Sequence, residues 1–193
     1  MSCFNRYRWE LVPDNLPVVK RNCPKCKGKT SFINTEKFRV NANKNNIDVW
    51  LIYQCEKCKS TWNMTIYERV NPREIDKEEY KGFLSNDKDL VKMYSFDMGV
   101  YSKNKAEVIL ENISYKVNKY TIEESSINED SIITITTKFP LEIRMDKFIS
   151  DNLNLSRSRV KAMIDKGYIT SNINNKLMKV KIVNSIELYV KNL

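Results

Sequence analysis

Alternation of apolar and polar residues predicts β-strands in two parts of the chain. Residues 113–117 and 133–137 both alternate with a period of two, and the polar stretch 123–130 would connect them. Residues 32–40 and 47–54 also favour strands, joined by an asparagine-rich turn. The chain is therefore expected to contain two hairpins that lie far apart in the sequence.

Helical segments are predicted between these hairpins. Pro72 suits the first turn of a helix, and residues 75–84 and 90–100 follow it as two short helices. Asn86 is placed to cap the second of them, which has acidic residues in its first turn.

The C-terminal region predicts two more helices and a set of short strands. Residues 144–153 place apolar side chains on one helical face. Ser156 is suited to cap a second helix, and Gly167 lies where a C-cap glycine belongs. The predicted strands are 168–170, 177–183 and 186–190.

Composition narrows the class of protein. The 193 residues are 41% hydrophobic, which is enough for a folded core. The absence of histidine excludes Ser-His-Asp and Cys-His catalysis and every His-ligated metal site. The longest apolar run spans residues 49–53, whereas a membrane helix needs about 20 residues. With no export signal in the polar N-terminus, we expect no membrane association and a cytoplasmic protein with reduced thiols.

Positive charge is concentrated at the two ends of the chain. The 33 basic and 24 acidic residues give a net charge of +9. Residues 1–70 carry +7, residues 71–143 carry −4 and residues 144–193 carry +6. Basic ends around an acidic middle suggest a polyanionic partner, although a lysine-rich surface also serves solubility alone.

Two Cys-x-x-Cys pairs are the most specific chemical signal in the sequence. Cys23 and Cys26 form the first pair, and Cys55 and Cys58 form the second. Each pair can place two sulfurs on one tight turn, so that two hairpins supply four thiolates to a tetrahedral ion. The sequence therefore predicts a zinc ribbon with a structural Zn²⁺. It also predicts a positive φ angle at Gly28, just past the turn of the first cysteine pair.

Alternative roles for the cysteines remain open from sequence. Iron accepts the same four thiolates, and the choice between zinc and iron is not decided by spacing. A thioredoxin-like redox pair would need one Cys-x-x-Cys at the start of a helix, whereas strands are predicted here. Cys3 has no partner in sequence and is expected to be an unliganded thiol.

Aromatic and basic residues surround the cysteine pairs. The aromatic residues are Phe38, Trp50, Tyr53 and Trp62, and the basic residues are Lys25, Lys27, Lys29, Lys57 and Lys59. In so small a domain we expect the rings to form the core, with stacking on nucleic-acid bases as the alternative. The lysines are candidates for phosphate contacts or for simple solvation of the turns.

The N-terminal region resembles an uncharacterised bacterial family. The segments that carry the resemblance are 9–13, 38–43, 48–53 and 61–63, together with the second cysteine pair. It spans about the first 70 residues and implies no known activity.

Residues 141–190 resemble the S-four RNA-binding domain, a small module with an αL fold. The resemblance rests on Arg144-x-Asp146-Lys147-Phe148, on Leu155-Ser-Arg-Ser-Arg159, and on Gly167-x-Ile169 followed by Asn172. Asn172-Ile173 and Asn184-Ser185 replace the usual turn residues of that domain. The family implies binding of structured RNA by the two helices and the following strand. The matching positions are Arg144, Lys147, Ser156, Arg157, Ser158, Arg159 and Lys161.

Helix electrostatics agree with phosphate binding at this place. The N-terminus of a helix presents free N–H groups and a positive dipole, which disfavours nearby cations. Arg157 and Arg159 are therefore expected there only if they and the helix N-terminus bind the same anion. The alternative is that Asp151 or another carboxylate neutralises them. Further basic residues would extend the face, namely Lys166, Lys176, Lys179 and Lys181.

These patterns together predict an α+β protein in three segments. They are a zinc ribbon at 1–70, an acidic helix-plus-hairpin connector at 71–140 and an S-four-like module at 141–193. The expected function is non-catalytic binding of structured RNA, either ribosomal or transfer RNA, with a protein partner possible and no small-molecule substrate indicated. The alternatives are an RNA-modifying enzyme, and a zinc-ribbon adaptor or DNA-binding regulator.

Overall fold

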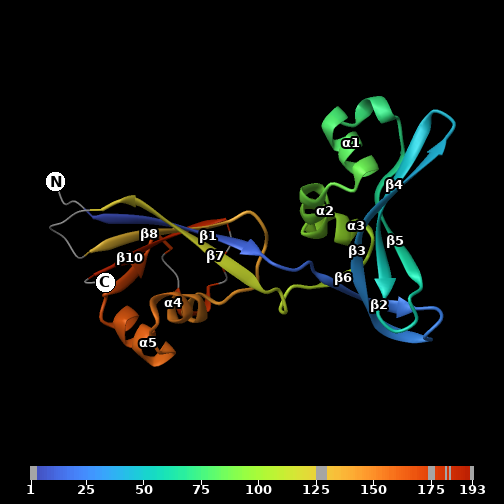
Figure 1. Ribbon diagram of the computed structural model, residues 1–193. Helices are drawn as coiled ribbons and strands as arrows, with labels where there is room; N and C mark the ends of the chain where they lie inside the picture. The colour runs from blue at the N-terminus through green and yellow to red at the C-terminus, as the bar shows by residue number, and fades with distance from the viewer. Residues whose placement is uncertain (1–3, 125–129, 174–176, 181, 183, 192–193) are drawn as a thin grey trace. The chain divides into compact units, whose positions relative to one another are not determined.

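The chain forms two compact units, and one is inserted into the other in sequence. The computed structural model describes residues 4–124, 130–173, 177–180, 182 and 184–191. Unit 1 comprises residues 1–15 and 113–193, and unit 2 comprises residues 16–112. Each unit contains one five-stranded sheet (Figure 1). The chain thus leaves unit 1 after a single strand and returns to it about a hundred residues later.

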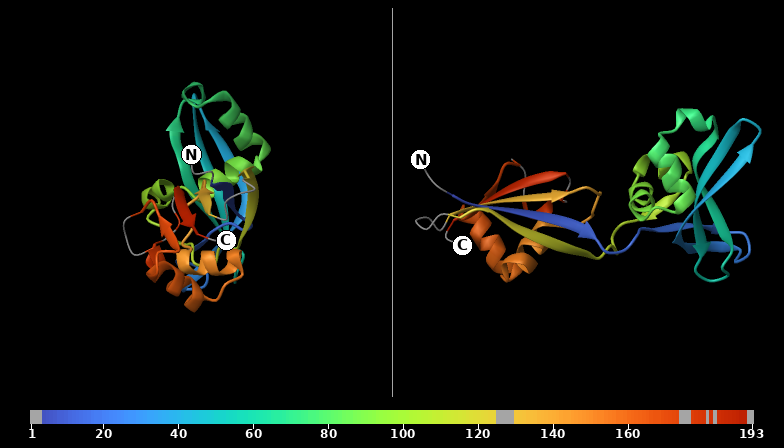
Figure 2. Two further views of the ribbon diagram at one scale, coloured as in Figure 1. Left: turned by 90° about the vertical axis from the view of Figure 1, so that its left-hand side faces the viewer. Right: turned by 45° about the horizontal axis from the view of Figure 1, so that its top comes forward.

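The sheet of unit 2 is antiparallel throughout, in the order β5-β4-β3-β2-β6. Its strands are β2 (Val18–Cys23), β3 (Gly28–Asn43), β4 (Asn46–Cys55), β5 (Thr61–Val70) and β6 (Glu107–Ile109). A 3-10 turn, η1 (Pro72–Glu74), leads into α1 (Lys77–Ser85), α2 (Lys88–Ser95) and α3 (Met98–Lys103). The three helices lie against one face of the sheet (Figure 2).

Aspartates, rather than Asn86, start the helices of unit 2. Asp76, Asp87 and Asp97 are the N-caps of α1, α2 and α3, and each side chain accepts hydrogen bonds from backbone N–H groups of the first turn. Asn86 instead ends α1 in the left-handed conformation, with φ of 56°. The cap at Asp97 divides the predicted helix 90–100 into α2 and α3.

The core of unit 2 is aromatic. Phe38 packs edge-on against Phe83, with ring centroids 5.0 Å apart. Tyr53 and Tyr101 are fully buried, and their hydroxyl groups are 2.8 Å apart. The Tyr101 hydroxyl also donates to the backbone carbonyl of Ser95 at 2.7 Å. Phe38 and Tyr53 therefore belong to the core, as expected for rings in a small domain.

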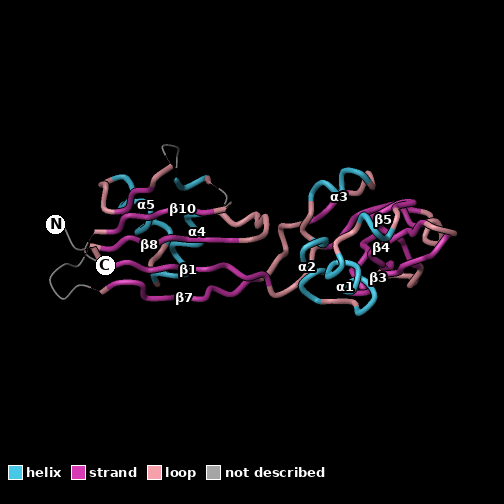
Figure 3. Tube along the Cα trace, turned by 90° about the horizontal axis from the view of Figure 1, so that it is seen from above, coloured by secondary structure: helices cyan, strands magenta, loops and turns pink. Residues whose placement is uncertain are grey.

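The sheet of unit 1 has the order β7-β1-β8-β10-β9. Its strands are β1 (Asn5–Pro13), β7 (Tyr115–Glu123), β8 (Ser131–Thr137), β9 (Ile169–Ser171) and β10 (Ser185–Val190). β1 is parallel to β8, and the other neighbours are antiparallel. Helices α4 (Met145–Leu153) and α5 (Arg157–Asp165) cover one face, so that they lie behind the strands in Figure 3. The Trp9 ring meets the Phe148 ring of α4 at 6.0 Å.

The predicted α+β class, with an N-terminal ribbon followed by a separate helical module, is wrong. The protein is mostly β, with two sheets that each gather strands from distant parts of the chain. β1 lies in the C-terminal sheet and not in a ribbon, because its apolar face at Trp9 and Leu11 is buried there. β9 and β10 extend the same sheet, so residues 141–193 are not a free-standing module.

Smaller expectations also differ from the structure. The predicted strand 177–183 contains a 3-10 turn, η2 (Leu177–Lys179), and positions 181 and 183 lie outside the described residues. The unit boundaries near 15 and 112 do not coincide with the predicted boundaries near 70 and 140. Within the described residues, no helix has the length and apolar character needed to span a membrane.

The buried tyrosine pair gives a test of the unit 2 core. Tyr101→Phe should lower the free energy of unfolding of unit 2 by about 1–3 kcal/mol, because it removes the buried hydrogen bonds of the Tyr101 hydroxyl with the Tyr53 hydroxyl and the Ser95 carbonyl. Urea unfolding followed by the fluorescence of Trp50 and Trp62 measures this change. Tyr120→Phe, at an exposed tyrosine, is the matched control and should change stability by less than about 0.5 kcal/mol.

Candidate functional site

The four paired cysteines meet at one end of the unit 2 sheet. Cys23 ends β2 and Cys55 ends β4, while Cys26 and Cys58 lie in the turns that follow these strands. The two hairpins lie side by side because β3 pairs with both β2 and β4, with Phe32 opposite Cys55. Four residues separated by up to 35 positions in sequence are thereby brought together.

The spacing of the sulfur atoms fits a tetrahedral ion. All four Sγ atoms lie within 4.8 Å of one another. The Sγ atoms of Cys23 and Cys58 are 3.4 Å apart, and those of Cys26 and Cys55 are 3.9 Å apart. A Zn²⁺ ion with Zn–S bonds of about 2.3 Å requires sulfur separations of about 3.8 Å. The cluster can therefore hold one metal ion, and four thiolates would close its coordination shell.

Hydroxyl groups and turn geometry support the cysteine cluster. Ser60 Oγ lies 3.0 Å from the Sγ of Cys58, and Thr30 Oγ1 lies 3.4 Å from that of Cys55. Lys27 and Lys59, each directly after the second cysteine of its pair, have φ angles of 53° and 61°. The predicted positive φ at Gly28 is therefore wrong by one residue. The sequence signal for both turns is the shared Cys-x-x-Cys-Lys pattern.

The cysteine thiols differ in acidity when no cation is bound. A hydrogen bond with Ser60 is the main cause that lowers the pKa of Cys23 to about 6. A hydrogen bond with Cys58 is the main cause that raises the pKa of Cys26 to about 12. A bound cation stabilises all four thiolates, so metal binding releases protons from this cluster.

An arginine beside the cluster was not singled out from sequence. The Arg21 guanidinium on β2 lies 4.1 Å from the centre of the Trp62 ring and 5.7 Å from that of Phe32. It occupies the face of Trp62 in a cation–π contact. Trp62 is thereby engaged within unit 2, which favours a structural role for this ring over base stacking.

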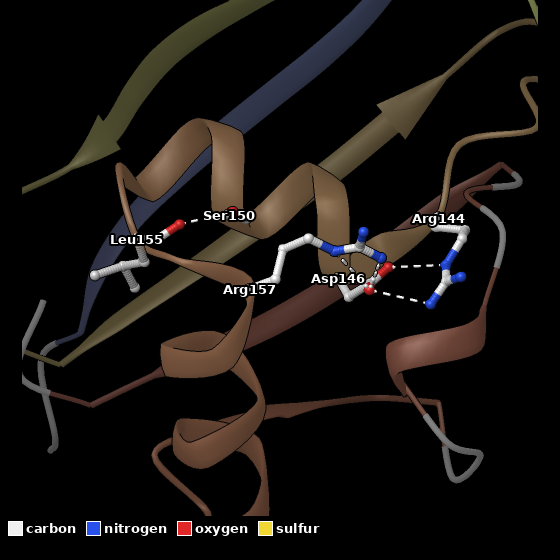
Figure 4. A network of polar contacts seen from close by, with 5 residues as sticks. All are labelled: Arg144, Asp146, Ser150, Leu155 and Arg157. Atoms are coloured by element: carbon white, nitrogen blue, oxygen red, sulfur yellow. Dashed lines mark hydrogen bonds and ion pairs between the residues drawn. The ribbon is translucent and has the colours of Figure 1, made fainter.

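A second cluster joins the starts of α4 and α5 in unit 1 (Figure 4). The Asp146 carboxylate is buried, with 1% of the residue exposed. Arg144 donates to it twice, from Nε and from a terminal nitrogen, both at 3.1 Å. Arg157 donates to the Oδ2 atom from Nε at 3.1 Å and from a terminal nitrogen. One buried carboxylate thus holds two guanidinium groups.

The carboxylate that pairs with Arg157 is Asp146, so the alternative of neutralisation by Asp151 or another carboxylate holds for Arg157 with a carboxylate other than Asp151. Sequence reasoning missed this role because Asp146 precedes Arg157 by 11 positions and the pair forms only when α4 packs against α5. The Arg144 and Arg157 side chains remain 56% and 54% exposed. Both arginine side chains are therefore bound to the carboxylate and still about half exposed to solvent.

The other predicted RNA-binding residues lie around this pair. Ser156 caps α5 and accepts a hydrogen bond from the Arg159 backbone N–H at 3.2 Å. Within the described part of the chain, Arg159 forms no ion pair. The remaining exposed members are Lys147, Ser158, Lys161 and Lys166. The side chain of Lys179 and the positions of Lys176 and Lys181 fall outside what the structure describes.

The ionisation of Asp146 depends on its arginine partners. Burial acts to raise its pKa, but hydrogen bonds from Arg157 and then Arg144 outweigh this and hold the pKa below its ordinary value. A carboxyl group with a lowered pKa contributes stability above its unfolded-state pKa of about 3.9, and that stability is lost as pH falls through the folded-state value.

The metal site predicts a loss of metal upon single substitution. Wild-type protein should contain one tightly held metal ion per chain, and Cys23→Ser should lose it and melt at a lower temperature, since structural metal contributes directly to folding. Elemental analysis and thermal melting measure both effects. Cys3→Ser is the control, at a position outside the described residues, and should keep the metal. Unchanged metal content and melting in Cys23→Ser would exclude the assignment.

The Asp146 pair predicts a pH-dependent loss of stability. At pH 7, Asp146→Asn should reduce the free energy of unfolding by about 1–2 kcal/mol, a value kept low because solvent screens the half-exposed arginines. The difference from wild type should shrink as pH falls below about 4, because the unfolded state then takes up a proton, and it should vanish only below the lowered pKa of folded Asp146. Asp165→Asn, at an exposed acid of α5, should leave the urea midpoint unchanged at every pH. A pH-independent difference for Asp146→Asn would contradict this role.

Comparison with known proteins places the chain in a family without known activity. A family model described as "Protein of unknown function (DUF1062)" matches residues 40–175. The expected membership of an uncharacterised family is confirmed, although the match covers the middle of the chain rather than its first 70 residues. It gives no support to the S-four resemblance of residues 141–190. No curated protein and no solved structure matches the chain. Because the family model covers more than half of its length, the chain belongs to this family of unknown function.

Proposed function

We propose that this protein binds structured RNA, without catalysis, through the exposed face formed by the starts of α4 and α5. The observation that carries the proposal is the pair of half-exposed arginine side chains, Arg144 and Arg157, whose guanidinium groups are bound to the buried carboxylate of Asp146. An arginine held in this way loses little conformational freedom when it binds a phosphate. Guanidinium groups bind phosphate oxygens through paired hydrogen bonds.

The charge around this pair favours a polyanion. Residues 144–166 contain six basic and three acidic residues, and one of the three acids is the buried Asp146. The first turn of α5 contains no acidic residue. Its positive dipole therefore adds to the field of Arg157, Arg159 and Lys161 rather than being neutralised by a side chain.

The residues available argue against an RNA-modifying enzyme. Asp146 is the only acidic residue buried among the described residues, and its carboxylate is already bound by two arginines. The chain has no histidine, and among the described residues of α4 and α5 the buried carboxylate is already engaged, so this face lacks the usual groups for proton transfer. Binding to the sugar-phosphate backbone of RNA needs only cations held in place. Duplex RNA is recognised largely through its shape and its phosphates.

The metal in this proposal is structural Zn²⁺. Four thiolates leave no open position for water, so the ion would join the β2–β3 and β4–β5 hairpins rather than perform chemistry. A reducing compartment such as the cytoplasm keeps those thiols available for the metal. Iron in place of zinc would be distinguished by elemental analysis and by visible absorption.

Arg157 tests the RNA-binding proposal. RNA affinity should fall as the salt concentration rises. If five cations contact phosphates, the logarithm of the affinity should fall with the logarithm of the salt concentration with a slope of about −3.5 to −4.5. These five cations are Arg144, Lys147, Arg157, Arg159 and Lys161. Arg157→Ala should weaken binding to several structured RNAs to a similar extent and reduce the size of the slope by about 1, because a phosphate contact carries little sequence information. Titration against a hairpin RNA at several salt concentrations measures both quantities.

Lys138→Ala removes an exposed cation of unit 1 that lies outside α4 and α5, and it should leave the slope unchanged. Equal affinities and parallel slopes for wild type and Arg157→Ala would remove Arg157 from any RNA site. Tighter binding to duplex DNA than to RNA would instead favour a DNA-binding regulator.

A further inference from the structure

A cavity of about 450 Å³ opens in unit 1 between the end of α4, α5 and residues of strands β1, β7 and β10. Its apolar walls include Trp9 of β1, Leu155 between the two helices and Met163 of α5. The volume lies within the range of about 300–1,000 Å³ found for small-molecule sites. None of the described residues that line it carries a negative charge. The cavity therefore combines an apolar interior with no electrostatic barrier to an anion.

Two cations from separate elements border this cavity. Lys119 of β7 donates to the backbone carbonyl of Asn152 at 3.0 Å, and its ammonium lies 4.4 Å from the centre of the Trp9 ring. Arg159 reaches the cavity from the first turn of α5. Both side chains are exposed, which leaves donors for an anionic group at the opening.

The cavity also contains an amide suited to recognising a base. Asn154 ends α4 in the left-handed conformation, with φ of 54°, and it lines the cavity with an exposed side chain. An asparagine side chain offers both donors and acceptors, which match the hydrogen-bonding edge of a nucleobase. An aliphatic ligand would leave the Asn154 amide without a hydrogen-bonding partner.

We propose that this cavity receives the base of one unpaired nucleotide of the bound RNA, while Arg159 and Lys119 hold its phosphate. The inference rests on the proposed function, because it takes the ligand to be part of the same RNA. Arg157 and Arg159 are two residues apart in the first turn of α5, one directed to Asp146 and the other to the cavity. One RNA strand can therefore contact the cluster and enter the cavity, as single-stranded bases do in pockets with aromatic and apolar walls.

The experiment compares two hairpin RNAs that differ by one unpaired nucleotide in the stem. Wild-type protein should bind the bulged hairpin about tenfold more tightly than the fully paired one, within the range expected for one inserted base. Met163→Trp fills the cavity and should abolish this preference while the affinity for the paired hairpin stays the same. Met98→Trp, at an exposed methionine of unit 2, is the matched control and should retain the preference.

A second variant keeps the test valid if the tryptophan disturbs folding. Lys119→Gln removes a cation of the cavity that is not part of the predicted RNA face, and it should also reduce the preference for the bulge. Retention of a tenfold preference in both cavity variants would overturn the inference. Fluorescence anisotropy at one fixed salt concentration measures all affinities, and thermal melting verifies that each variant is folded.

The remaining outcomes separate this inference from the proposed function. Equal binding of both hairpins by wild-type protein would overturn the cavity assignment and leave the proposed function intact. Failure to bind either hairpin would overturn both. Equal binding of the hairpins together with saturable binding of decanoate that Met163→Trp abolishes would overturn the inference and assign the cavity to an anionic amphiphile.

Discussion

The pairing of β1 with strands from the second half of the chain is the constraint on which the remaining structure depends. β1 lies between β7 and β8 in the sheet, although the whole of unit 2 separates it from both in sequence. Closing a flexible loop of that length would cost about 4 kcal/mol. Unit 2 reduces this cost because it brings its own ends together, with Val18 of β2 opposite Ile109 of β6. The folding of the inserted unit therefore favours assembly of the sheet that receives it.

Unit 2 owes its integrity to two different interactions. Between its sheet and α1–α3 lies an aromatic core in which Phe83 and Tyr101 are almost completely buried. At the cysteine end of the sheet, the turns after β2 and β4 depend on the thiol cluster and on two left-handed lysines. A core alone would leave those turns without partners, and a metal alone would leave the helices unpacked. The two interactions therefore stabilise different parts of one sheet.

In unit 1, one carboxylate organises the cationic face. Asp146 is buried at the start of α4, so its charge requires partners, and Arg144 and Arg157 supply them. The pairing links the starts of both helices and leaves each arginine side chain half exposed. The same turn of α5 places Arg159 beside the apolar cavity. Structural pairing of Arg157 is therefore compatible with the RNA binding that we propose for this face.

Features that depend on residues close in sequence were predictable from the sequence. The spacing of the cysteines indicated two turns that share one ion, and the structure brings these four sulfurs together. Ser156 was predicted as the cap of α5 because the hydrogen bond that it accepts comes from only three residues away. Membership of an uncharacterised family was also indicated by local segments. For the cap and for each Cys-x-x-Cys pair, the physical signal lies within one turn.

The tertiary structure alone decided the strand order of unit 1, the partner of Arg157 and the cavity. Nothing in the pattern of β1 indicates that its neighbours are β7 and β8, since alternating residues fit any sheet with one buried face. Asp146 and Arg157 lie on different helices, and the cavity joins Trp9, Lys119 and Met163 from three distant segments. The sequence determined which residues could pair, bind metal or carry charge. Packing between elements decided which of them meet, because such contacts form only when distant segments bury their apolar faces against one another.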